Sequence, residues 1–129
     1  MIEVCAGIIQ KDGKILIARR KLGAHLEGMW EFPGGKVEIG ESHEQCLRRE
    51  LFEEFGIETT VGDFVAQSIF DYGKGKEIRL SGYLVAYLSG EFVLNDHSEI
   101  CWIDAAEFDN FDFAPADLPI LEVLKKNMV

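Results

Sequence analysis

The sequence predicts one α/β domain built on a mixed β-sheet. Stretches rich in β-branched and aromatic residues alternate with two helical segments, a pattern typical of a sheet packed against helices. The chain has 129 residues, the size of one domain, so we expect residues 1–129 to fold as a single unit. We find no internal repeat, linker or low-complexity segment that would divide them.

The elements of the first half are expected from β-prone runs separated by glycine and proline. Apolar side chains alternate along the second run, as in a half-buried strand. In chain order we expect a strand over 1–10, a turn at Lys11-Asp12-Gly13, a strand over 14–20, a loop over 21–29, and a short strand over 30–32 that Pro33-Gly34-Gly35 ends.

The second half predicts a long hairpin and a C-terminal helix. The helix should open near two prolines, which are tolerated where the first N–H groups lack partners anyway. Its apolar face should comprise Leu118, Leu121, Val123 and Leu124. The expected elements are strands over 59–72 and 76–88 with a turn at 73–75, a brief strand over 91–93, a last strand over 100–103, a turn of helix over 105–108, and a helix opened by residues 115–119.

The best-defined element is a helix expected over residues 42–55. Ser42 can accept a hydrogen bond as the N-cap, and Gln45 three residues later completes a capping box. Gly56 suits the end of the helix because glycine adopts the left-handed conformation without steric penalty.

One face of this helix is acidic. Glu53 and Glu54 follow Glu50 at i+3 and i+4, so the three carboxylates share a narrow face. Such a face is often only solvated surface. It becomes favourable when a divalent cation lies among the oxygens, because hard cations such as Mg²⁺ take carboxylate ligands. The neighbouring face, which should be buried, carries Leu47, Leu51 and Phe55.

Composition limits the classes of partner. Hydrophobic residues make up 47% and charged residues 28% of the chain, as in ordinary globular proteins. The net charge of −10 argues against a nucleic-acid polymer or an anionic membrane as partner. A phosphate-bearing substrate would be repelled as well unless metal ions neutralise the site.

The cysteines and the N-terminus favour a cytoplasmic location. Cys5, Cys46 and Cys101 form neither a disulfide framework nor a zinc-binding pattern, so we expect free buried thiols in a reducing compartment. We identify no signal peptide and no apolar run long enough to span a bilayer.

The stretch GKVEIGESHEQCLRRELFEEFGI, residues 35–57, resembles the signature of the Nudix hydrolases, G-x5-E-x7-R-E-U-x-E-E-x-G-U with U aliphatic. The match covers each fixed position at each spacing. The matching residues are Gly35, Glu41, Arg49, Glu50, Leu51, Glu53, Glu54, Gly56 and Ile57.

The resemblance extends over nearly the whole chain and is greatest to the MutT-like branch. It implies a sheet sandwiched between helices, with the signature forming a loop–helix–loop. It also implies a nucleoside triphosphate substrate that water cleaves between the α- and β-phosphates, with Mg²⁺ as cofactor and Mn²⁺ as a substitute. Metal ions activate water and stabilise the attacking and leaving oxygens.

The resemblance also assigns roles to residues of the signature. It implies that Glu50, Glu53 and Glu54 are metal ligands and catalytic residues, with Glu41 as a secondary ligand and the Gly34 carbonyl as a further one. Arg49 lies one turn before Glu53 and can orient its carboxylate. The alternative for Arg49 is an ordinary i,i+4 surface pair.

A further acid is expected from the loop before the last strand. Asp96 falls where MutT-like proteins usually carry a catalytic glutamate, although aspartate is one methylene shorter. Glu99 is a rival candidate, and either can be a solvated loop acid.

Other matching positions concern the substrate. Arg20 and His25 occupy positions that contact phosphate or nucleotide in the family, Phe32 lies beside the nucleotide pocket, and Gly35 and Lys36 complete the substrate-binding set. Arg20 has independent support, since an acidic protein needs a cation facing a polyanion. His43 and His97 are expected to face solvent.

Asp117 departs from part of the family. It aligns with an asparagine of the enzyme specific for 8-oxoguanine nucleotides, and its segment is similar to that of bacterial pyrophosphohydrolases for CTP and modified cytidine. An ionised aspartate accepts from an exocyclic amino group, as on cytosine N4. A protonated one in a dry pocket can still serve an oxidised purine. Alternatively, Asp117 only caps the last helix.

The leading hypothesis is therefore a Mg²⁺-dependent nucleoside triphosphate pyrophosphohydrolase that acts on 8-oxo-dGTP or on cytidine triphosphates in nucleotide-pool sanitation. A Nudix hydrolase of another nucleoside diphosphate derivative is the second reading. A binding module without catalysis is the third, although such a module should lose signature glutamates and none is lost here. We expect a monomer or a homodimer.

Overall fold

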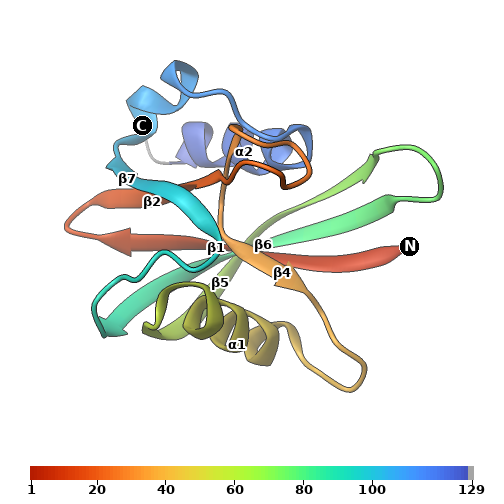
Figure 1. Cartoon of the computed structure of the whole chain (residues 1–129). Helices are drawn as coiled ribbons and strands as arrows, with labels where there is room; N and C mark the ends of the chain where they lie inside the picture. The colour runs from red at the N-terminus through yellow and green to blue at the C-terminus, as the bar shows by residue number, and fades with distance from the viewer. Residues whose placement is uncertain (128–129) are drawn as a thin grey trace.

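The computed structural model describes residues 1–127, which form a mixed sheet covered on both faces (Figure 1). The helix α1 (His43–Phe55) covers one face. The other face is covered by two 3-10 helices, η1 (Ala105–Asn110) and η2 (Pro115–Asp117), and by α2 (Leu118–Asn127). The α/β class with a mixed sheet between helices is confirmed.

The sheet has seven strands and a split at β1. β1 pairs along its length with β6 in parallel, and its other edge is shared between β4 and the end of β2. All other pairings are antiparallel, and the longest is the β5–β6 hairpin. The strands are β1 (Ile2–Lys11), β2 (Lys14–Arg20), β3 (Trp30–Glu31), β4 (Gly34–Lys36), β5 (Glu58–Asp71), β6 (Glu77–Ser89) and β7 (His97–Ile103).

One prediction for the strands is wrong, and one strand was not predicted. The short strand stops before Pro33 as predicted, but Gly34 and Gly35 begin a further strand, β4, which pairs with Val4–Ala6 of β1. Residues 91–93 form no strand. Instead, Val93 N donates to Phe55 O at 2.9 Å, so this segment follows the end of α1.

The α1 helix begins and ends as its sequence predicts. The Ser42 side chain accepts from Gln45 N at 3.1 Å, and the Gln45 side chain accepts from Ser42 N at 2.9 Å. Gly56 has φ +72°, in the left-handed region, and its N–H bonds to Phe52 O. The helix is therefore fixed at both ends by local contacts.

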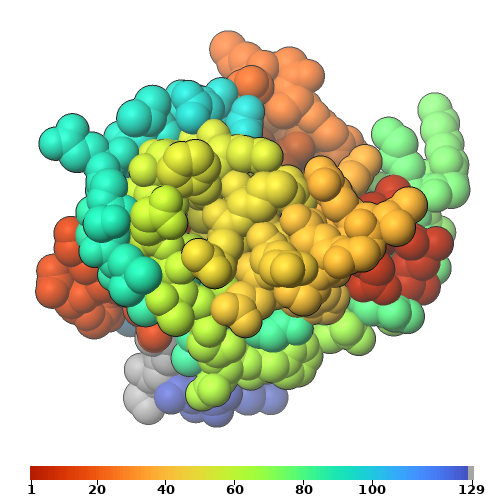
Figure 2. Space-filling model, turned by 90° about the horizontal axis from the view of Figure 1, so that it is seen from below, coloured from red at the N-terminus to blue at the C-terminus, as the bar shows by residue number. Residues whose placement is uncertain are grey.

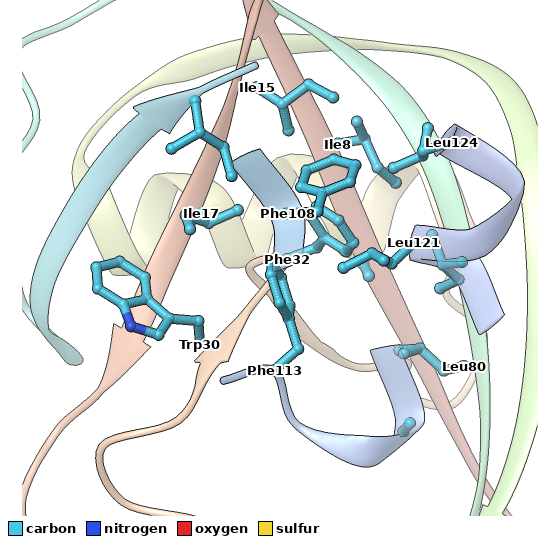
Figure 3. Close-up of a cluster of buried hydrophobic side chains, with 14 residues drawn as sticks. Ile8, Ile15, Ile17, Trp30, Phe32, Leu80, Phe108, Phe113, Leu121 and Leu124 are labelled. Atoms are coloured by element: carbon cyan, nitrogen blue, oxygen red, sulfur yellow. The ribbon is translucent and has the colours of Figure 1, made fainter. Parts of the chain in front are cut away.

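The sheet separates two hydrophobic cores. Leu47, Leu51 and Phe55 of α1 are fully buried against one face, as predicted. On the other face, Phe32, Phe108 and Phe113 pack together with residues of β1, β2 and α2 (Figure 3). The α2 helix buries Ile120, Leu121 and Leu124 there.

The predicted face of α2 is only partly right. Leu118 is 45% exposed and Val123 is half-buried, because the buried stripe comprises Ile120, Leu121 and Leu124. Across residues 1–127, no helix is long and apolar enough to cross a membrane. Cys5 and Cys46 are buried free thiols as expected, and Cys101 is only half-buried.

Candidate active site

The two glycines of β4 let the signature pack against the sheet. A Cβ on Gly34 would lie 1.9 Å from Cys5 O of β1, and a Cβ on Gly35 would lie 2.3 Å from Cδ of Glu50. Real Cβ atoms do not approach that closely. The Glu50 carboxylate therefore occupies space that only a glycine at position 35 leaves open.

Arg49 connects several carboxylates of the signature. Its Nε and Nη2 bind both oxygens of Glu41 at 2.7 and 2.9 Å, and its Nη1 binds Glu50 at 2.7 Å. Glu53 is a more distant partner at 3.3 Å. The Arg49 guanidinium holds the pKa of Glu41 at about 2. Arg49 is thus more than an i,i+4 partner of Glu53, and its main contact is the bidentate one to Glu41.

Glu54 points away from Arg49 into the protein. It is 6% exposed, and its Oε2 is buried without a hydrogen-bond partner. Burial raises the pKa of Glu54 to about 10, and the charges of Glu31, Glu50 and Asp96 add to the rise. Burial also raises the pKa of Glu50. With a pKa of about 10, Glu54 holds its proton near neutral pH until a cation replaces it.

Residues 91–96 place Asp96 beside Glu54. Asn95 N donates to Glu54 O at 3.2 Å, and Asn95 Nδ2 donates to Glu53 O at 2.9 Å. These bonds satisfy carbonyls that the end of a helix leaves free. Figure 2 shows this segment alongside α1. The rival acid, Glu99, pairs with Arg19 at 3.2 Å instead.

A cavity of about 530 Å³ extends from Glu54 to Asp117. Glu54, Asp96 and His97 meet where residues 95–97 contact the end of α1, and they form the acidic end of the cavity. Hydrogen bonds at Asp117 and Ala116 bring Phe32, Tyr72 and Asp117 together at its other end. The cavity brings together these predicted site residues: Arg20, His25, Phe32, Gly34, Gly35, Lys36, Glu54, Asp96 and Asp117. Four other predicted site residues lie outside the cavity lining: Glu41, Arg49, Glu50 and Glu53.

Asp117 is buried at its end of the cavity. It is 5% exposed, and its Oδ1 accepts a hydrogen bond from Phe32 N at 3.1 Å. Burial raises the pKa of Asp117 well above its usual value, and the charge of Glu31 contributes. The Asp117 carboxyl thus bonds to Phe32 N, just after β3, and not to a backbone N–H at the start of α2. This contact argues against Asp117 being only a cap of the last helix.

Glu31 is a residue of the site that sequence reasoning missed. Its two oxygens bind Arg20 Nη1 and His97 Nε2, each at 2.8 Å. Arg20 also donates from Nε to His25 O. The Glu31 charge influences both Glu54 and Asp117, so it lies between the two ends of the cavity. Its place beside Phe32 in WEFPGG was the available signal.

The predicted exposure of two histidines is wrong. The His97 side chain is 3% exposed and its ring stacks on Phe55 at 5.4 Å, because the bond to Glu31 and the end of α1 cover it. His43 is half-buried, with Nδ1 2.7 Å from the Tyr83 hydroxyl. His25 lines the cavity, and its contact with the substrate stays a prediction.

The donor set suits a hard divalent cation. Glu54 Oε2 is a buried oxygen without a partner, and the Glu50 and Asp96 charges lie close enough to raise the Glu54 pKa. Among residues 1–127, no three acidic, histidine or cysteine side chains are already arranged to hold an ion. Glu50 and Glu53 are bonded to Arg49, so they would exchange the guanidinium for the cation.

A mixed sheet between helices, with an acidic loop–helix–loop beside a cavity of about 530 Å³, suits a hydrolase that cleaves phosphoanhydrides. Comparison with known proteins agrees. Residues 1–124 match the NUDIX domain family. The chain belongs to the Nudix family, and the resemblance seen in its signature is confirmed.

Several relatives are similar over almost their full length. The chain is 45% identical over 122 residues to CTP pyrophosphohydrolase of Escherichia coli (strain K12), covering 95% of this chain and 90% of the relative. It is 36% identical over 125 residues to 8-oxo-dGTP diphosphatase of Haemophilus influenzae (strain ATCC 51907 / DSM 11121 / KW20 / Rd), covering 96% and 91%. The solution structure of the E. coli ORF135 protein superposes with a TM-score of 0.87 at 44% identity, covering 98% of this chain and 89% of that one.

Proposed function

We propose that this Nudix hydrolase is a Mg²⁺-dependent nucleoside triphosphate pyrophosphohydrolase that prefers cytidine triphosphates. Water attacks phosphorus, the bond between the α- and β-phosphates breaks, and a nucleoside monophosphate and pyrophosphate leave. One observation carries the proposal: a single cavity is lined by buried Asp117 at one end and by buried Glu54 and exposed Asp96 at the other. The relatives' names support the substrate class.

At the acidic end, carboxylates would hold a cation, and cationic side chains would hold the phosphates. Glu54 must release its proton before its carboxylate can bind a cation, and Glu50, Glu53 and Asp96 would complete the ligand set. A bound Mg²⁺ would activate water and screen the negative charge of the triphosphate. Arg20 and Lys36 line the cavity and supply positive charge toward the same phosphates.

At the other end, the Asp117 carboxyl is the group that meets the base. Its Oδ1 is occupied by Phe32 N–H, which leaves Oδ2 for a ligand. When ionised, Oδ2 accepts from an amino group such as cytosine N4–H₂. The raised pKa of Asp117 favours the protonated form, which donates, and this supports 8-oxo-dGTP as a second candidate substrate.

Pyrophosphate release across a panel of normal and oxidised triphosphates, with and without Mg²⁺, tests the proposal. We expect release only with the cation, with CTP or dCTP as the best substrate. Asp117→Asn should shift the preference away from cytosine by about tenfold, since one polar contact of this kind contributes about 1–3 kcal/mol of discrimination. Turnover without divalent cation, or an unchanged preference in Asp117→Asn, would contradict it.

A further inference from the structure

Tyr72 connects three segments around the Asp117 end of the cavity. It comes from the turn between β5 and β6 and lines the cavity. Its hydroxyl oxygen accepts a hydrogen bond from Ala116 N at 3.2 Å. Its ring meets His25 edge-on, with centroids 5.0 Å apart. One side chain thus contacts both η2 and the loop over residues 21–29.

The Tyr72 side chain is itself held firmly. Its ring packs on Phe70 with centroids 4.6 Å apart, and its backbone N–H bonds to Lys76 O at 3.0 Å. The Asp71 side chain accepts from Gly73 N at 2.7 Å and closes the turn. Because these contacts leave Tyr72 little freedom to move, its hydrogen bond can fix the position of η2.

Ala114, the N-cap of η2, donates from its N–H to Trp30 O at 2.9 Å, and two further hydrogen bonds tie the Asp117 turn itself to the rest of the protein. One runs from Phe32 N to Asp117 Oδ1, and the other runs from Ala116 N to Tyr72. Burial raises the pKa of Tyr72, and the nearby Asp117 charge adds to the rise, which places the two groups close together. Removing the Tyr72 hydroxyl would free the residue next to Asp117 while leaving the Asp117 carboxyl intact.

We propose that Tyr72 is a positioning residue for base recognition. By accepting the Ala116 N–H it fixes the turn that carries Asp117, and so sets where the Asp117 carboxyl meets the base. The inference rests on the proposed function, because it takes the Asp117 end of the cavity as the place of the base. It adds a residue outside the signature, on the β5–β6 turn, to the determinants of specificity.

A double-mutant cycle with Tyr72→Phe and Asp117→Asn tests the inference. Tyr72→Phe keeps the ring against His25 and removes only the hydroxyl. Losing one hydrogen bond of about 1 kcal/mol corresponds to about a fivefold effect. We expect a fivefold rise in KM for CTP, a change in kcat below twofold, and a fivefold fall in the preference for CTP over UTP, the ratio of their kcat/KM values. In the Asp117→Asn background, Tyr72→Phe should change that preference less than 1.5-fold.

Tyr87→Phe is the matched control, since the Tyr87 hydroxyl also bonds to a backbone group, Gly90 O, but lies outside the cavity lining. It should leave KM and base preference unchanged. An unchanged preference in Tyr72→Phe overturns the inference, and so does an equal change in both backgrounds, which would mean direct contact with the base. If Asp117→Asn alone leaves preference unaltered, the assignment of the base pocket fails instead.

Discussion

Replacing Glu54 by glutamine should stabilise the metal-free protein at alkaline pH and not at acidic pH. The Glu54 carboxyl is 6% exposed and its pKa is raised from 4.5 to about 10. Glu54 therefore binds its proton more tightly in the folded protein than in the unfolded chain. Stability from the neutral acid is fully present below the unfolded pKa near 4.5 and is lost as pH rises toward about 10.

The magnitude follows from the interval between the two pKa values. Each pH unit within it costs about 1.4 kcal/mol of folding free energy, so raising the pH from 5 to 8 costs at most about 4 kcal/mol. Desolvation is the main cause of the raised pKa, and relaxation of the folded protein around the charged carboxylate lowers that cost, so the expected loss is about 2 kcal/mol. Glutamine keeps the shape of Glu54 and carries no charge, so Glu54→Gln should escape this loss.

Urea unfolding in EDTA at several pH values measures the effect. The difference in unfolding free energy between Glu54→Gln and the wild type should grow by about 2 kcal/mol from pH 5 to pH 8. Taking the change with pH cancels any constant effect of the amide. Glu44→Gln, an exposed carboxylate in the first turn of the same helix, controls for the loss of one charge. A change below about 0.5 kcal/mol would refute the view that Glu54 is a desolvated acid.

Three further predictions concern the glycine of β4, the core under α1 and the base pocket. Gly35→Ala should lower kcat at least 100-fold, because the new Cβ would lie 2.3 Å from Cδ of Glu50 and displace that carboxylate; steady-state assays at saturating Mg²⁺ measure it. Leu51→Ala should lower the unfolding free energy by about 2–4 kcal/mol in urea titrations, since Leu51 is fully buried. Raising the pH should increase the kcat/KM ratio of CTP to 8-oxo-dGTP, because the raised pKa of Asp117 means that the carboxyl becomes an acceptor only as pH rises.

Each of these has a control in the same chain. Gly62→Ala introduces only ordinary contacts, 3.4 Å from Leu84 O, and should leave kcat unchanged. Phe52→Ala removes a side chain that is 54% exposed, so it should cost less than about 0.5 kcal/mol. The pH dependence of base preference should disappear in Asp117→Asn. Activity that survives Gly35→Ala with stability intact would contradict the packing argument.

Local signals made α1 the most predictable element. Ser42, Gln45 and Gly56 act on their near neighbours in the chain, so their effect can be derived from spacing alone. The β5–β6 hairpin was similarly predictable from its β-prone runs and its glycine turn. In both cases the groups that interact lie within a few residues of one another or alternate with a fixed period.

Long-range contacts explain what the sequence left undetermined. Consecutive glycines disfavour a strand, yet Gly34 belongs to β4. A glycine is needed there because Cys5 O of β1 approaches too closely for any side chain. Residues 91–93 were predicted as a brief strand, but Val93 N donates to Phe55 O at the end of α1. His97 becomes buried through Glu31, from a strand far away in the chain. The pattern of apolar and polar residues does not indicate which distant segments lie side by side.

The departures from local rules coincide with the cavity. Three features are each unfavourable for folding by themselves: the glycine pair within β4, the burial of the Glu54 carboxyl, and the burial of His97. Burial and the Glu31 charge both raise the pKa values of Glu54 and Asp117, so the same small volume concentrates like charges that folding alone would keep apart. Such a cluster is retained where a bound cation and a polar ligand offset its cost. The fold therefore supplies rigidity through α1 and the sheet, while the cavity keeps the unfavourable groups that the proposed chemistry uses.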